Sequence, residues 1–221
     1  MKILIIAPHP DDEVLGCGGT IVKHVSSGDE VYLCIVTKAY PPDWSEDEIP
    51  RRKQEVLKAN EILGIKKTYF LDFPTVRLDT IPQKELADSI SRLVNEVKPE
   101  IVYVPHKGDV NRDHHLVFAA TLVATRPQPA LRIRKVLCYE VLSETEWGVP
   151  SVENAFIPNV YVDISETLET KLKAMSEYKS ELKEFPHPRS LEAISALAKV
   201  RGAAAGVKAA EAFMLVREVQ T

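Results

Sequence analysis

The sequence has few cysteines, no long apolar run and no signal-peptide pattern. Its three cysteines, Cys17, Cys34 and Cys138, are scattered and odd in number, which fits reduced thiols rather than a disulfide framework or a cysteine-based zinc site. No apolar stretch reaches the ~18 residues that mark a membrane-spanning helix. The N-terminus also lacks a charged region followed by a cleavage site. These absences predict a cytoplasmic chain without stable membrane insertion.

The chain also has no excess of positive charge. The chain carries 28 Lys and Arg against 32 Asp and Glu, a formal net charge of -4 at pH 7. A general nucleic-acid binder would show a basic stripe, so a small-molecule substrate is the expected partner. With 221 residues, 45% hydrophobic, and no repeat or break in composition, the sequence predicts one globular domain over residues 1–221.

The first polar cluster follows the first predicted strand. Ile3 to Ile6 is a β-branched apolar run, as expected of a parallel strand covered on both faces. The next segment supplies one imidazole and three carboxylates: His9, Asp11, Asp12 and Glu13. Open α/β sheets bind ligands at this edge, and the first turn of a helix keeps carboxylates ionised. The spacing lets His9 and Asp12 converge on one divalent cation while Asp11 stays free to move a proton.

A second polar cluster follows the predicted strand Glu100–Val104. It occupies residues 106–115, a loop expected to lead into a helix over Leu116–Ala124. His114 completes a two-histidine, one-carboxylate set, which leaves a tetrahedral zinc ion one open position for water. On bare chemistry His115 competes with His114 for that role. Either Asp109 or Asp113 could hold the second nitrogen of a ligand histidine.

Three further residues are candidates for substrate contact or catalysis. Trp44 lies in a proline-rich acidic loop over residues 38–50, where it is either a sugar-stacking platform or a loop anchor. Arg52, with Arg51, is expected in the first turn of a helix ending at Leu63, where the helix dipole disfavours a cation. His187 lies in a proline-fixed polar turn and either reaches over the metal site or stays at the surface.

The order of the predicted elements indicates the fold class. Strands and helices alternate through most of the chain, which implies a mainly parallel sheet with helices on both faces, a Rossmann-like α/β fold. The other predicted strands are Glu30–Thr37, Thr68–Phe73, Val136–Val141, Asn159–Ile164 and Phe213–Val219. The other predicted helices are Arg51–Leu63, Gln83–Val97, one from Ser165, and Leu191–Ala205.

These motifs resemble the PIG-L/LmbE-like family of zinc-dependent N-deacetylases, relatives of the N-acetylglucosaminyl-phosphatidylinositol deacetylase. The resemblance covers most of the chain, and its most specific part is Pro8-His9-Pro10-Asp11-Asp12-Glu13. Five shorter motifs support it: Gly18-Gly19-Thr20, Arg52-x-x-Glu55, Asp109-x-Asn111-x-Asp113-His114, Tyr178-Lys179-Ser180-Glu181-Leu182 and Ala210-Glu211-Ala212-Phe213.

The resemblance implies an activity and a set of roles. The reaction would be hydrolysis of an N-acetylated amino sugar or its conjugate to acetate and a free amine, in a homo-oligomer such as a trimer or hexamer. Zn²⁺ would be held by His9, Asp12 and His114, with Asp11 as general base. Many members have a histidine where this chain has Asn111, which cannot exchange a proton at neutral pH, so Asp11 or His187 becomes the general acid. The remaining predicted roles are substrate contact for Arg52, Trp44 and Asp109, and support of the ligands for Asp113 and Glu13.

Three other interpretations compete with this one. Gly16-Cys17-Gly18-Gly19 after a strand is similar to a dinucleotide-binding loop. The fingerprint, however, requires a third glycine where this chain has Ile21, and the second strand ends in Thr37 without the ribose-binding acid at its tip. A binding or scaffold protein would have no use for Asp11. A zinc amidohydrolase acting on a non-sugar acylamine stays open.

Overall fold

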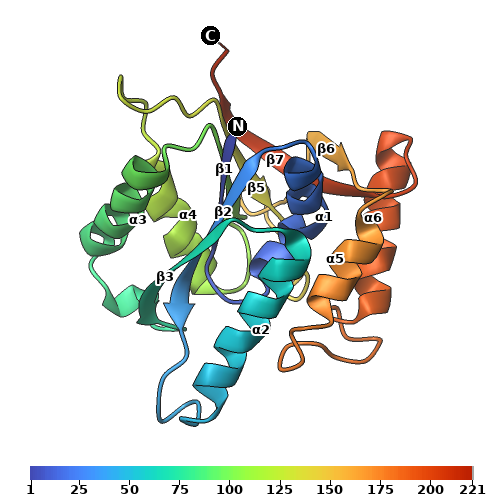
Figure 1. Ribbon diagram of the computed structural model, residues 1–221, viewed down its shortest axis with the longest axis horizontal. Coiled ribbons are helices and arrows are strands. Elements are labelled where there is room, and N and C mark those ends of the chain that lie inside the picture. The colour runs from blue at the N-terminus through green and yellow to red at the C-terminus, as the bar shows by residue number, and fades with distance from the viewer. Residues whose placement is uncertain (221) are drawn as a thin grey trace.

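The computed structural model describes residues 1–220 and shows a central sheet between two layers of helices (Figure 1). The seven strands lie in the order β3-β2-β1-β4-β5-β7-β6. Strands β1 to β5 are parallel, and β7 runs antiparallel to both β5 and β6. The strand bounds are β1 Lys2–Ala7, β2 Glu30–Lys38, β3 Lys67–Pro74, β4 Ile101–Pro105, β5 Lys135–Tyr139, β6 Val160–Asp163 and β7 Ala210–Glu218.

Helices cover both faces of this sheet. Helices α3 (Gln83–Val97) and α4 (Arg112–Ala124) lie on one side, at the left of Figure 1. The opposite side carries α1 (Asp12–Ser26), α2 (Glu48–Leu63), α5 (Leu168–Met175) and α6 (Leu191–Ala205), and a short 3₁₀ helix, η1, spans Leu78–Thr80. The predicted single α/β domain with a mainly parallel sheet is confirmed. No helix within residues 1–220 is long and apolar enough to cross a membrane.

The core explains why the first strand is apolar at every position. Ile3, Ile5 and Ala7 pack with the residues of α1 and α2, whereas Leu4 and Ile6 pack with those of α3 and α4. All five side chains are completely buried. A strand covered on both faces has no solvent side, so polar residues appear only where the strand ends.

The glycines of α1 admit neighbouring side chains. They lie inside the helix, not in a loop before it, which separates them from a dinucleotide-binding turn. A Cβ atom on Gly16 would lie 2.2 Å from Cδ2 of Tyr139, and one on Gly19 would lie 2.7 Å from Cγ2 of Ile164. The glycines therefore bring α1 close to β5 and to the chain after β6.

Two predicted helix boundaries are wrong in ways that matter for the site. Helix α4 begins at Arg112 rather than Leu116, because Asn111 caps it by accepting a hydrogen bond from Asp113 N at 3.0 Å. Its first turn therefore carries Asp113, His114 and His115 of the second polar cluster. Helix α2 begins at Glu48, so Arg52 lies beyond its first turn and not at the positive end of its dipole.

Candidate active site

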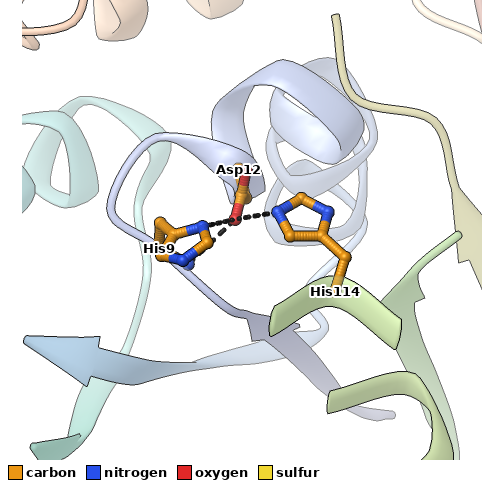
Figure 2. Close-up of side chains that lie close together, drawn as sticks. All are labelled: His9, Asp12 and His114. Carbon is orange, nitrogen blue, oxygen red and sulfur yellow. Dashed lines mark hydrogen bonds and ion pairs between the residues drawn. The ribbon is translucent and has the colours of Figure 1, made fainter. Parts of the chain in front are cut away.

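Two neighbouring strands bring the candidate metal ligands together. His9 and Asp12 follow β1, His114 follows β4, and these strands pair in parallel through Ile3 and Ile101. Asp12 Oδ2 lies 3.5 Å from His9 Nδ1 and 3.3 Å from His114 Nε2, with both rings directed at the carboxylate (Figure 2). One ligand atom from each residue lies within 4.8 Å of the other two. This donor set is typical of a zinc site with an open position.

A separate carboxylate holds each histidine. Asp109 Oδ2 lies 2.7 Å from His114 Nδ1, and Asp113 Oδ2 lies 2.9 Å from His9 Nε2. Each contact occupies one ring nitrogen and leaves the other facing Asp12. The sequence left open whether Asp109 or Asp113 holds a ligand histidine. In the structure both do, since Asp109 contacts His114 and Asp113 contacts His9.

The buried atoms of this cluster fit a cation. His114 Nε2 is buried and has no hydrogen-bond partner within residues 1–220, although it points at Asp12. Burial opposes the ionised form of Asp12, but His114 and His9 hold the pKa of that carboxyl well below its usual range. Burial lowers the pKa of His114, yet Asp12 and Asp109 raise it well above its ordinary value. The site therefore favours positive charge beside Asp12, which a divalent cation would supply.

His115 lies outside this cluster. Its Nε2 contacts the backbone carbonyl of Asp109, whereas His114 turns inward from the same helical turn. Because consecutive residues of a helix point in different directions, only one of the two can face the partner strand.

Asp11 lies next to the candidate ligand Asp12 but outside the ligand cluster. It is the residue before α1, with φ of 102°, and its carbonyl accepts hydrogen bonds from Val14 N and Leu15 N at 2.9 Å. Its Oδ2 is buried without a hydrogen-bond partner in the described chain and lies 3.6 Å from Arg189 Nη1. Burial raises the pKa of Asp11 well above its ordinary value, and Arg189 only partly opposes this. The prediction that the helix N-terminus keeps Asp11 strongly acidic is therefore wrong.

Glu13 holds the backbone of the same turn through a hydrogen bond. It is completely buried, accepts a hydrogen bond from the Tyr178 hydroxyl, and accepts another from Asp11 N at 3.2 Å. Burial raises the pKa of Glu13 to about 7, against the hydrogen bond from Tyr178. Glu13 thus positions the backbone of Asp11 and lies outside the ligand cluster.

A cleft of about 470 Å³ opens beside the cluster. His9, Asp11 and Asn111 line it beside the candidate ligands, and Trp44 and Arg52 line it from α2 and the loop before that helix. Arg52 Nη1 is ion-paired with Glu181 Oε1, so the charge of Arg52 is partly neutralised within the protein.

Asp109 and His187 lie elsewhere than their predicted roles require. Asp109 is 1% exposed and is bound to His114 and Thr145, which favours support of the candidate ligand His114 over the predicted substrate contact. His187 does not line the cleft, and its ring lies 6.0 Å from that of Trp147. The proline-fixed turn instead directs Arg189 toward the site.

Sequence reasoning missed Arg189. Its guanidinium lies 2.7 Å from Glu181, 3.3 Å from Glu144 and 3.6 Å from Asp11, and it donates to Ser143 Oγ at 2.7 Å. The sequence feature that could have indicated it is a cation placed directly between Pro188 and Ser190, the N-cap of α6. An arginine in a surface turn has no local feature that distinguishes it from a solvated one.

Comparison with known proteins gives the same assignment as the motifs. The family model described as PIG-L, GlcNAc-PI de-N-acetylase, matches residues 4–125. The chain is 32% identical over 187 residues to the uncharacterized deacetylase YaiS of Escherichia coli, covering 80% of this chain and 90% of that protein. It is 30% identical over 193 residues to the diacetylchitobiose deacetylase of Thermococcus kodakarensis, covering 83% of this chain and 71% of that enzyme.

A solved structure agrees over the whole fold. The conserved protein TT1542 of Thermus thermophilus superposes with a TM-score of 0.80 at 26% identity, covering 99% of this chain and 96% of that one. The family match spans the first polar cluster and the second, including all three candidate ligands. The chain therefore belongs to the PIG-L family of de-N-acetylases.

Proposed function

We propose that the protein is a zinc-dependent hydrolase that removes the acetyl group from an N-acetylated amino sugar or its conjugate, releasing acetate and a free amine. The observation that carries the proposal is the buried cluster of His9, Asp12 and His114, with the Asp11 carboxylate beside it, whose Oδ2 has no hydrogen-bond partner among residues 1–220. The sugar assignment is supported by relatives named as a diacetylchitobiose deacetylase and as a probable N-acetyl-α-D-glucosaminyl L-malate deacetylase.

His9, Asp12 and His114 would hold the metal through His9 Nδ1, Asp12 Oδ2 and His114 Nε2, the atoms that face one another. A bound zinc ion would lower the pKa of its water and polarise the amide carbonyl. Asp109 and Asp113 would keep the two imidazoles in the required tautomers.

Asp11 would carry the proton. Its Oδ2 has no other hydrogen-bond partner among residues 1–220, so it can accept a proton from the attacking water and return it to the departing amine nitrogen. Arg189 is held by Glu181 and Glu144, and it fixes the electrostatic surroundings of this carboxylate.

Asn111 would stabilise the oxyanion. Its Oδ1 is occupied by Asp113 N, and this fixes the amide so that its NH₂ group remains available to donate a hydrogen bond at the cleft. Since an amide does not exchange a proton at neutral pH, the general acid in this scheme is Asp11 in its protonated form.

The cleft has a suitable size for a sugar. Its volume of about 470 Å³ lies within the range of small-molecule sites, roughly 300–1,000 Å³. Trp44 lines it and supplies a face on which a pyranose ring can stack. A cytoplasmic location stays a prediction from the sequence, and a trimeric or hexameric assembly stays one from the family resemblance.

Acetate release tests the proposal. The zinc-loaded protein is incubated with N-acetylglucosamine, with N,N'-diacetylchitobiose and with an acylated non-sugar amine, and the Asp11→Asn variant is assayed alongside. We expect release from a sugar that is abolished by chelation and reduced at least ~10²-fold in the variant, while the variant still binds one zinc per chain. Near wild-type turnover by the variant would remove Asp11 from the mechanism, and release from the non-sugar amine alone would move the substrate class.

A further inference from the structure

We propose that Val76 is a specificity-determining residue that contacts the substrate at the cleft and selects a ring with an apolar face. This inference rests on the proposed function and deepens it. Val76 follows β3, lines the cleft, and is 64% exposed.

The backbone at Val76 is strained. Its φ is 58°, in the left-handed region that valine rarely adopts because its branched Cβ crowds the backbone there. The other non-glycine residues with positive φ within residues 1–220 are unbranched at Cβ: Asp11, Asp72, Lys98 and Ser143. The exposed isopropyl group gains little from packing, so burial of the side chain does not offset the strain.

Asp113 imposes this conformation. Its Oδ2 accepts a hydrogen bond from Val76 N at 2.7 Å and its Oδ1 accepts one from Leu78 N at 3.3 Å. The same Oδ2 lies 2.9 Å from His9 Nε2. One buried carboxylate therefore fixes both a candidate metal ligand and the turn that presents Val76. Strained residues held by surrounding structure cluster at functional sites.

The following residue ties this turn to the loop that carries Trp44. Arg77 Nη2 lies 3.2 Å from Asp43 Oδ2, and its guanidinium lies 5.0 Å from the centre of the Tyr40 ring. The Tyr40 and Trp44 rings are 6.2 Å apart. Two apolar side chains, Val76 and Trp44, are thus held on the lining of the same cleft by linked loops.

The side chain of Val76 is not needed for the turn itself. Glycine would adopt the same backbone angles and donate the same N–H to Asp113 without a Cβ conflict. What valine adds is an apolar group beside the candidate metal site. The C–H faces of a pyranose ring are apolar and rigid, so they match such a contact better than a short flexible acylamine does.

Substitution to glycine separates contact from scaffold. The Val76→Gly variant is compared with the wild type and with Lys98→Gly, a matched control that also replaces a residue of positive φ, 52° at Lys98, at the end of α3 and away from the cleft. Steady-state kinetics are measured on N,N'-diacetylchitobiose and N-acetylglucosamine, together with zinc content and the melting temperature. We expect Val76→Gly to raise KM at least fivefold with kcat within twofold, and to melt no lower than the wild type. Lys98→Gly should leave both kinetic constants unchanged.

The outcomes distinguish this inference from the proposed function. No acetate release by the wild-type protein on either sugar would overturn the proposed function and, with it, the substrate contact. Release by the wild type with an unchanged KM in Val76→Gly would overturn the inference alone. A fall in kcat and zinc content at unchanged KM would show that Val76 only supports Asp113, and would also overturn it.

Discussion

Lys171 and Glu211 form an ion pair buried inside the fold, with 2.6 Å between Lys171 Nζ and Glu211 Oε1. Lys171 also donates to the carbonyl of Leu15 at 2.8 Å, while Glu211 accepts from Gly19 N at 2.9 Å and Thr20 N at 2.7 Å. An α-helix directs the N–H of Gly19 at the carbonyl of Leu15. The pair therefore bonds to the N–H and the C=O of one i, i+4 position of α1, the helix that carries Asp12.

Removal of one partner of this pair should destabilise the protein strongly. Lys171→Met leaves a buried carboxylate without its cation, which costs about 3–5 kcal/mol of unfolding free energy in comparable buried pairs. The double variant Lys171→Met/Glu211→Met should recover at least half of that loss, because it leaves no buried charge without a partner. Urea unfolding measures both. A single variant that loses under about 1 kcal/mol would show that the pair contributes little.

His114, and not His115, should be required for metal binding. His114→Ala removes an inward ligand atom, and we expect it to lose stoichiometric zinc and all turnover. His115→Ala is the matched control, since its ring contacts a backbone carbonyl outside the cluster. Zinc content after dialysis is the readout. Full zinc retention by His114→Ala would refute the ligand set.

Asp109 and Asp113 should act on the metal through the histidines that they hold. Replacement of either by asparagine keeps the shape but weakens the contact to its imidazole, and should reduce zinc affinity about 10–100-fold. Competition with a chromogenic chelator measures the affinity. For Asp109, a raised KM at unchanged zinc affinity would instead restore the substrate-contact role that its burial argues against.

Arg189 should matter more for turnover than His187. Arg189→Gln removes the cation that lies beside Asp11 and joins Glu181 to Glu144, so we expect at least a ~10-fold larger loss of kcat/KM than in His187→Gln. His187 contacts Trp147 at the outside of the same turn, which makes it a close control. The reverse order would return the catalytic role to His187.

Zinc should stabilise the folded protein. A ligand that binds only the folded state adds about 2.7 kcal/mol when its free concentration is 100 times Kd. For a chain of this size that corresponds to a rise of roughly 5–10 °C in melting temperature. Scanning calorimetry with and without a chelator measures the shift. The same melting temperature in both conditions would contradict a site formed in the folded state.

Local patterns predicted much of the fold and the core of the site. The apolar run before His9 and the strand before His106 both indicate parallel strands, whose carboxyl ends share one edge of a sheet. That logic brought His9 and His114 near each other without any structural information. Asn111, a strong N-cap residue, also indicates the start of α4, yet the loop expected over residues 106–115 includes the first turn of that helix.

Other features depend on contacts that no local pattern encodes. Which aspartate holds which histidine is decided by side-chain directions on two separate elements. Lys171 belongs to a helix of ordinary polar composition, yet it packs against Gly18 of α1 and is buried. The left-handed backbone of Val76 is imposed by Asp113 across 37 residues of chain, against the local preference of valine.

The pairing of β1 with β4 has a consequence for assembly. In the order β3-β2-β1-β4-β5-β7-β6, every strand on one side of that junction comes from the first part of the chain, and every strand on the other side from the second. His9 and Asp12 belong to one part and His114 to the other, so a metal ion held between them would link the two parts at the β1–β4 junction. Loading of the ion would then report that both parts have docked in register, and a misdocked chain would stay both empty and inactive.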